Sequence, residues 1–496
     1  MSGNAQMISR RWLLGALLAG VAVPAAAEAP LTSLFPMPRG ATLRAPVPKP
    51  AAALIEAAKL GGAVGFVVAD AATGEVLESI GARLARPPAS TLKAITALYA
   101  LERLGAGHRF ATRLLATGPL VGGRIEGDLV LVGSGDPTLS TDVLGDMAEA
   151  LAALGVREVA GRYLAFGGAL PAVSRIDPGQ PDHVGYNPGI SGLNLNYNRV
   201  HFEWKRAGGG YDVAMDARAE RFVPRVSMSR MQVVNRSVPL FTYQQGDSAD
   251  NWTVAQAALG QGGSRWMPVR HPDVYAAEVF QTLALAQGVK LPVAGFVRVL
   301  PEGRVLVERQ SADLTPMLRD LLRFSTNLTA EVVGLTASGA RTLEGSAGQM
   351  AAWAAERYGL RARFVDHSGL GAGSRIAQAD MVAALVAGRN GAAGPQLHGV
   401  LRDFGMRDAQ GRVIEGHPVR VLAKTGTLNF VSGLAGYMVP KAGRELAFAV
   451  FASDLARRGR LDLAEREQPP GGEDWTRRAR QLQARLLDRW AGLYIA

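Results

Sequence analysis

Three short motifs carry side chains that could act together on an acyl group. They are Ser90–Lys93, Ser325–Asn327 and Lys424–Thr427, in this order along a chain of 496 residues. Each motif is common in isolation, because a serine often caps a helix and a lysine can end a strand before a turn. Whether the three motifs can act together depends on the secondary structure that positions them.

The first motif is predicted to begin a helix. Between Ser90 and about Leu104, apolar residues recur three positions apart, at Leu92, Ile95, Leu98 and Leu101. Ser90 then lies at the helix N-terminus and Lys93 lies one turn later on the same face. Serine with a lysine base is a known nucleophile arrangement. To accept a proton near neutral pH, Lys93 must lower its pKa from about 10.4 to about 7–8, which costs about 4 kcal/mol; burial and a second cation, Lys424, are expected to supply it.

The other two motifs offer groups that bind a peptide. Lys424 ends an apolar strand, and Gly426 lets a substrate backbone lie close along that edge. Lys424 and the hydroxyl groups of Thr425 and Thr427 can hold a terminal carboxylate. At the predicted start of another helix, Ser325 offers a hydroxyl for proton relay and Asn327 an amide for the substrate backbone.

The surrounding pattern predicts one α/β domain that is split by an insertion. Strands are expected in a hairpin at 64–77 and at 419–422, 431–439 and 445–451; helices at 90–104, 314–322, 328–337, 346–358, 380–387 and 475–490. Between 107 and about 306 the chain is rich in short strands and glycine turns, with a helix at 272–287. The segment 200–268 is expected to be irregular.

The N-terminus indicates export. Arg10 and Arg11 precede a short apolar run that ends in small residues near Ala27, and the run is too short for a membrane span. The pair of arginines resembles a twin-arginine signal, although a plain secretory signal fits as well. Either signal places the mature protein outside the cytoplasm, and we expect the periplasm with at most peripheral membrane association.

Composition excludes several kinds of chemistry. The chain has no cysteine, so disulfides, thiol nucleophiles and thiolate metal sites are excluded. Seven histidines without a spaced cluster predict no metal site, and we expect four of them to be loop or surface residues: His201, His271, His367 and His417. Asp136 and Asp366 are expected to form turns. The net charge of +11 is scattered and no nucleic-acid motif is present, so a solvated surface or an anionic wall is favoured over nucleic acid.

These motifs resemble the D-alanyl-D-alanine carboxypeptidase/endopeptidase family, the class C low-molecular-mass penicillin-binding proteins. The resemblance extends to Leu131–Pro137, Gly192–Asn198, Asp366–Leu370 and the stretch from Lys424 to Gly436-Tyr437. It implies an α/β transpeptidase-like fold, with an antiparallel sheet flanked by helices and inserted β-rich subdomains. The implied division is 1–27 export signal, 28–50 extended lead-in, 51–106 and 307–496 catalytic domain, 107–199 and 269–306 inserted domain II, and 200–268 inserted domain III.

By this resemblance, Ser90 attacks the carbonyl of the penultimate D-alanine of a peptidoglycan stem peptide and Lys93 is the general base. Ser325 passes the proton to the leaving group. Asn327 binds the substrate amide, and the Lys424–Thr427 motif, Gly426 included, binds the terminal carboxylate. The backbone N–H groups of Ser90 and Thr427 form the oxyanion hole. No cofactor is implied, and β-lactams would acylate Ser90.

Two positions depart from the family pattern. Thr326 stands where an acidic or amide residue is commoner, and Gly371 stands where a serine is commoner. Because residue 326 points away from its neighbours' face, its change is expected to matter little. We assign no catalytic role to the loop that precedes Gly371.

Two other functions stay open at this point. A β-lactamase uses the same serine, lysine and Lys-Thr-Gly motif. However, the sequence shows no Glu-x-x-Leu-Asn pattern before the Lys424 strand, and a β-lactamase would not explain the long insertion. A non-catalytic envelope protein could keep the fold to bind peptidoglycan. The sequence also leaves open whether the enzyme removes a terminal D-alanine or cuts cross-links.

Overall fold

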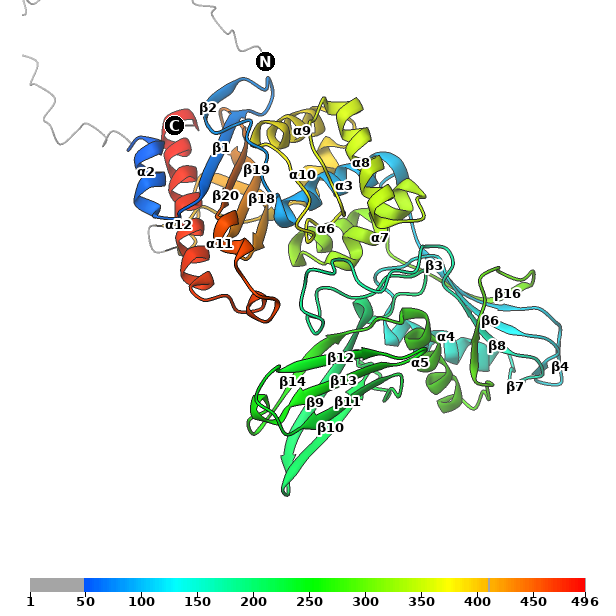
Figure 1. The fold of residues 1–496 in the computed structure, drawn as a ribbon. Helices are drawn as coiled ribbons and strands as arrows, with labels where there is room; N and C mark the ends of the chain where they lie inside the picture. The colour runs from blue at the N-terminus through cyan, green and yellow to red at the C-terminus, as the bar shows by residue number, and fades with distance from the viewer. Residues whose placement is uncertain (1–48, 409–410, 496) are drawn as a thin grey trace, which may run out of the picture. The chain divides into compact units, whose positions relative to one another are not determined.

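A six-stranded sheet combines strands from both sides of the predicted insertion (Figure 1). The structure, a computed structural model, describes residues 49–408 and 411–495. In sheet order the strands are β17 (Arg402–Asp403), β18 (Val419–Leu428), β19 (Val431–Pro440), β20 (Leu446–Ser453), β1 (Ala63–Asp70) and β2 (Val76–Ile80). β1 pairs antiparallel with β2 and with β20. The predicted hairpin at 64–77 is therefore confirmed, and its strands complete a sheet begun by the C-terminal strands.

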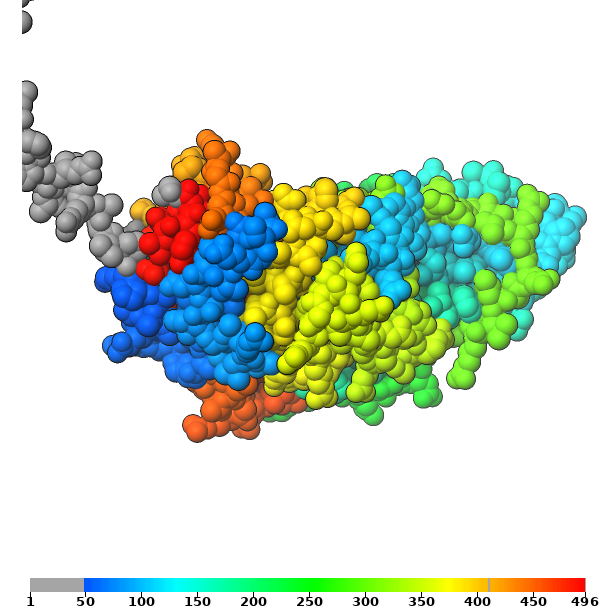
Figure 2. Space-filling view, turned by 90° about the horizontal axis from the view of Figure 1, so that it is seen from above, coloured from blue at the N-terminus to red at the C-terminus, as the bar shows by residue number. Residues whose placement is uncertain are grey.

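Helices cover both faces of this sheet (Figure 1). One face packs against α2 (Ala51–Ala58) and α12 (Gly472–Trp490), where the ring of Trp490 lies 5.3 Å from that of Phe66. Figure 2 shows these N-terminal and C-terminal segments side by side. On the other side, the sheet shares one core with six helices: α3 (Leu92–Leu104), α6 (Leu314–Phe324), α7 (Asn327–Ser338), α8 (Leu343–Tyr358), α9 (Gln378–Asn390) and α10 (Gly394–Val400).

The strands of this sheet bury side chains on both faces. In β1, Phe66 and Val68 belong to the core with α12, whereas Val67 and Ala69 belong to the core with α3 and α9. Successive strand residues point to opposite faces, so an apolar run such as this one fits a sheet covered twice. The run of helices predicted between residues 314 and 387 is confirmed. No helix within the described residues is long and apolar enough to cross a membrane.

A second sheet forms part of the insertion. Its order is β15 (Ala294–Phe296), β8 (Tyr163–Phe166), β6 (Leu129–Gly133), β3 (Ala111–Ala116) and β16 (Arg304–Gln310). The helices α4 (Thr141–Ala153) and α5 (Pro272–Ala286) pack with it in one core. A small sheet joins β4 (Leu120–Val121), β5 (Arg124–Ile125) and β7 (Glu158–Val159). The helix predicted at 272–287 is confirmed, whereas α4 was not anticipated.

The segment 200–268 is more regular than predicted. It contains β9 (Arg199–Ala207), β10 (Gly210–Asp216), β11 (Ser229–Val234), β12 (Phe241–Gln245), β13 (Asp250–Ala255) and β14 (Gly262–Pro268). They form two three-stranded sheets, ordered β10-β9-β14 and β11-β13-β12. The expectation of an irregular segment was wrong because many residues of these strands are exposed or only half-buried. Such strands lack the apolar runs that mark a strand in sequence.

The observed architecture confirms the predicted fold class, an antiparallel sheet flanked by helices with β-rich insertions. The predicted export signal, 1–27, and all but the last two residues of the lead-in, 28–50, lie outside the described residues. The remaining short helix, α11 (Leu455–Gly459), follows β20 and begins the connection to α12.

Candidate active site

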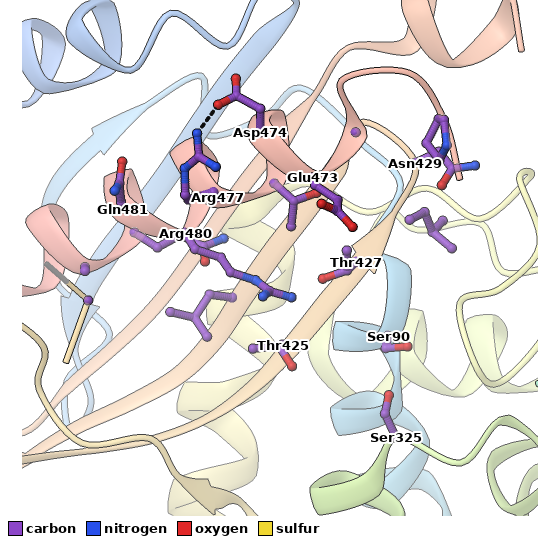
Figure 3. A pocket seen from close by; sticks show the side chains of 18 of the residues that line it. Ser90, Ser325, Thr425, Thr427, Asn429, Glu473, Asp474, Arg477, Arg480 and Gln481 are labelled. Carbon is purple, nitrogen blue, oxygen red and sulfur yellow. Dashed lines mark hydrogen bonds and ion pairs between the residues drawn. The ribbon is translucent and has the colours of Figure 1, made fainter. Parts of the chain in front are cut away.

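Ser90 sits in a tight turn that is fixed by its surroundings. A 3-10 turn, Ala89–Thr91, directly precedes α3. Ala89 has φ 48°, a left-handed conformation that residues with a Cβ seldom adopt, and is fully buried. The hydroxyl of Thr91 donates to the carbonyl oxygen of Pro88 at 2.6 Å. Ser90 is therefore held at the start of α3 by packing, with its side chain facing a cleft (Figure 3).

Lys93 contacts the hydroxyl of Ser90. Its Nζ donates to Ser90 Oγ at 2.9 Å, to Asn327 Oδ1 at 2.7 Å and to the carbonyl oxygen of Ser368 at 2.8 Å. The side chain is completely buried. Burial lowers the pKa of Lys93 to about 8, while the carboxylates of Glu331 and Asp366 oppose that change. The amine is thus much closer to neutrality at physiological pH than a surface lysine.

The expected cause of the Lys93 pKa shift was partly right. Burial is the dominant cause, as expected. The repulsion between Lys93 and Lys424 acts instead on Lys424. The pKa of Lys424 lies well below its ordinary value, chiefly because of burial, and the charge of Lys93 lowers it further. Arg402 lowers the pKa of Lys424 further.

Two buried acids behind Lys93 were not recognised as part of the site. Glu331 accepts the backbone N–H groups of His367 and Ser368, each at 2.9 Å, and Ser368 in turn supplies a carbonyl to Lys93. Burial raises the pKa of Glu331 to about 8, helped by repulsion from Asp366. Glu331 follows Asn327 by four residues on α7, and this helical spacing was the signal that could have revealed it.

Asp366 shapes the loop that carries Ser368. It accepts the N–H groups of Gly369 at 2.8 Å and Gly371 at 2.5 Å, so the prediction that Asp366 forms a turn is confirmed. Burial also raises the pKa of this carboxyl. Asp136 is likewise a turn residue, because it accepts the N–H of Thr138 at 2.8 Å.

The second motif lies between two helices. Ser325 caps the C-terminus of α6 in a left-handed conformation, φ 61°, and Asn327 begins α7. Only Asn327 therefore begins a helix, as both were predicted to do. Besides accepting from Lys93, Asn327 donates its Nδ2 to the carbonyl oxygen of Tyr186 at 2.9 Å. Tyr186 belongs to the insertion, and its contact with Asn327 has no signature in the sequence.

The third motif lies on β18 opposite the first. Lys424 is buried and donates to Ser325 Oγ at 2.9 Å and to the carbonyl oxygen of Thr425 at 2.8 Å. Gly426 lies against the turn Ala89–Thr91, since a Cβ at this position would come within 2.7 Å of the Pro88 oxygen and 3.0 Å of the Ser90 nitrogen. Figure 3 shows Ser90, Ser325, Thr425 and Thr427 around one space. The structure thus brings all three motifs together.

The cleft in front of these residues has a volume of about 1540 Å³. Gln180 and Tyr186 of the insertion line one part of it. Another part is lined by α12 and by Arg402, Phe404, Gly405, Arg407, Asp408 and Gly411. The opening therefore extends well beyond Ser90, and a peptide longer than two residues has room to bind.

Two histidines depart from the expected loop or surface positions. His367 is completely buried, with Nε2 2.6 Å from Ser346 Oγ, and burial lowers its pKa to about 3. His201 is buried on β9, where its ring nitrogen comes near Glu203 and Asp216. Arg218 already pairs with both of those carboxylates at 2.8 Å. The cluster around His201 therefore already holds a cation, the guanidinium group.

Comparison with known proteins identifies the family. The D-Ala-D-Ala carboxypeptidase 3 (S13) family matches residues 49–469. The chain is 30% identical over 446 residues to the D-alanyl-D-alanine carboxypeptidase of Actinomadura sp. strain R39, covering 80% of this chain and 79% of that protein. It is 22% identical over 436 residues to D-alanyl-D-alanine carboxypeptidase DacB of Haemophilus influenzae, covering 82% and 89%.

A solved structure shares the fold. Penicillin binding protein 4 of Haemophilus influenzae superimposes with a TM-score of 0.69 at 19% identity, covering 86% of this chain and 99% of that one. At this identity the likeness concerns the fold alone. The family expected from the motifs is confirmed by the match over residues 49–469, and the chain belongs to the D-Ala-D-Ala carboxypeptidase 3 (S13) family.

Proposed function

We propose that this serine-type D-Ala-D-Ala peptidase cleaves peptidoglycan stem peptides through an acyl-enzyme on Ser90. One observation carries the assignment of the nucleophile. Ser90 Oγ lies 2.9 Å from Nζ of Lys93, a fully buried lysine whose pKa is lowered to about 8. A neutral amine at this position can take the hydroxyl proton as the oxygen attacks a carbonyl.

The neighbouring groups support a complete acyl-transfer sequence. Ser90 Oγ bonds to the carbonyl carbon of the penultimate D-alanine while Lys93 takes its proton. The backbone N–H groups of Ser90 and Thr427 stabilise the oxyanion, each worth roughly 3–4 kcal/mol. The C–N bond then breaks, and the departing amine receives a proton through Ser325, whose hydroxyl contacts Lys424. Water finally hydrolyses the ester and releases the shortened peptide.

Substrate binding is assigned to the rest of the cleft. Lys424, Thr425 and Thr427 bind the terminal carboxylate, and Gly426 lets the peptide backbone approach β18. Asn327 binds the substrate amide, for which its Nδ2 must exchange the carbonyl of Tyr186 for that of the substrate. The 2.9 Å hydrogen bond from Asn327 to Tyr186 supports this assignment, because it holds the amide beside the cleft.

β-Lactams should acylate the same serine. A structure of Haemophilus influenzae penicillin binding protein 4 is complexed with a β-lactam. In this protein, the leaving nitrogen of a β-lactam would stay attached to the acyl group, so the acyl-enzyme should decay slowly. The β-lactamase alternative differs in this respect, since it requires fast deacylation.

The location and organisation proposed from the sequence complete this picture. We propose a periplasmic protein exported by the segment 1–27, with at most peripheral membrane contact and no nucleic-acid partner. We also propose the division into a catalytic domain (51–106, 307–496), domain II (107–199, 269–306) and domain III (200–268). The separate sheets support it, but β16 (Arg304–Gln310), a strand of the second sheet, crosses the boundary at 306. The proposed substrate of the catalytic domain lies in the bacterial wall, which fits this location.

A fluorescent penicillin tests the acyl-enzyme. The purified protein and the Ser90→Ala variant are incubated with the reagent and separated on a denaturing gel. A lasting band in the parent alone supports the proposal. A band that vanishes while free antibiotic is consumed favours a β-lactamase. No band in the folded parent leaves a binding protein without catalysis.

A further inference from the structure

The cleft has an excess of positive charge beyond the catalytic residues. Among the described residues that line it, seven are arginines and four are acids. Three of the acids are engaged in ion pairs: Glu467 with His183 and Arg265, Asp474 with Arg477 and Arg478, and Asp408 with Arg412. Their negative charge is therefore largely neutralised.

Six of the seven lining arginines form no ion pair within residues 49–408 and 411–495, and Arg402 and Arg480 are two of the six. Arg402 is exposed and its guanidinium lies 5.0 Å from the ring centre of Phe404. Arg480 is an exposed residue of α12. Glu473, the fourth acid of the lining, pairs with neither of them in this part of the chain. Both guanidinium groups are thus available to an anion that enters the cleft.

Both arginines lie near the proposed carboxylate-binding strand. Arg402 on β17 is the register partner of Ala423, the residue before Lys424. Its charge also contributes to the depressed pKa of Lys424, which reflects their proximity. Arg480 reaches the cleft from α12, and its side chain extends toward the strand that carries Thr425 and Thr427 (Figure 3). β17 and α12 therefore each bring a positive charge to the part of the cleft that β18 lines.

We propose that Arg402 and Arg480 form a subsite for a leaving group that carries several carboxylates, as the second stem peptide of a cross-link does. This inference rests on the proposed function. A free D-alanine leaving group brings one carboxylate, which Lys424, Thr425 and Thr427 can hold. In a cross-link, the amine released when the C–N bond breaks belongs to a second peptide with further carboxylates. The subsite thus favours cutting of cross-links over trimming of single peptides.

The test compares two substrates. The variants Arg402→Gln, Arg480→Gln and the double variant are assayed on a monomeric stem pentapeptide and on a cross-linked peptide dimer. We expect the double variant to lose at least about tenfold more kcat/KM on the dimer than on the monomer. We also expect this difference to shrink in high salt, because exposed charges are screened. The control is Arg304→Gln, which removes one exposed charge from β16, outside the cleft lining.

A binding measurement separates this proposal from the catalytic one. In the Ser90→Ala background, fluorescence anisotropy with the labelled dimer measures affinity without turnover. Affinity should fall about tenfold when both arginines are replaced and stay unchanged with Arg304→Gln. An equal loss of kcat/KM on the monomer and the dimer, or no loss on either, overturns the subsite. Failure of the parent to form an acyl-enzyme while the binding difference persists overturns the catalytic proposal alone.

Discussion

Gly426 is the point where β18 contacts the backbone of the turn Ala89–Thr91, which holds the proposed nucleophile, and its replacement by alanine should impair acylation. The added Cβ would lie 2.7 Å from the Pro88 oxygen, 3.0 Å from the Ala89 Cβ and 3.0 Å from the Ser90 nitrogen. Backbone atoms cannot rotate away as a flexible side chain can. β18 must therefore retreat by a few tenths of an ångström from Ser90.

That retreat separates the two proposed oxyanion donors, the N–H groups of Ser90 and Thr427. Loss of one such donor costs about 3–4 kcal/mol, or about 10² to 10³ in rate. We expect the second-order rate constant for acylation by benzylpenicillin to fall by about this factor in Gly426→Ala, as measured by stopped-flow fluorescence.

A matched variant controls for the glycine-to-alanine change itself. Gly348 lies within α8, and a Cβ there meets no atom within 4 Å, so Gly348→Ala should acylate at the parent rate. Thermal melting checks that Gly426→Ala is folded. Acylation of a folded Gly426→Ala within about threefold of the parent would refute the role assigned to this contact.

Three further predictions concern titratable groups. The acylation rate should rise with pH up to about 8, the pKa of Lys93, and level off above it, because only the neutral amine accepts a proton; a flat profile from pH 6 to 9 would contradict this. Glu331→Gln should move the rising limb to lower pH, since an attraction that raises the Lys93 pKa is lost. It should also lower the free energy of unfolding by about 1–3 kcal/mol, because the amide oxygen can accept one of the two loop N–H bonds but the amide nitrogen cannot accept the other; the surface variant Glu344→Gln should do neither. Glu467 has its pKa lowered to about 2, first by its hydrogen bond with His183, so its contribution to stability is present above pH 4.5 and lost as the pH falls toward 2. Glu467→Gln should therefore have a free energy of unfolding about 1 kcal/mol below that of the parent at pH 7, and this difference should shrink at pH 3; an equal difference at both pH values would argue against this ion pair.

The sequence predicted well the helix and the strand that carry the first and third motifs. The helix after Ser90 and the strand of Lys424 were predicted from local apolar patterns, and both elements are largely buried. The three motifs meet because β18 packs against the turn at Ala89, and the absence of a Cβ at Gly426 permits this contact. The family resemblance supplied the expectation that they would meet.

The residues that sequence reasoning missed act through tertiary contacts. Glu331 resembles any helical glutamate until the fold places it under the loop of Ser368. The carbonyl of Tyr186 has no side-chain signature, and its contact with Asn327 joins residues 141 positions apart. The exposed strands of 200–268 escaped detection because many of their residues are exposed or only half-buried, so few apolar runs mark them in the sequence. Local pattern thus pointed to the proposed reacting groups but not to the residues that contact them and shift their pKa values.

The most direct test of the central account is release of D-alanine by the parent and by Ser90→Ala. The substrate is a stem peptide that ends in D-alanyl-D-alanine, and a peptide ending in D-alanyl-L-alanine is the control. We predict release from the first peptide by the parent, trapping of an acyl group on Ser90 by acid quench, and loss of at least about 10³ in rate in the variant. Release by Ser90→Ala at the parent rate, or an acyl group on another residue, would contradict the mechanism.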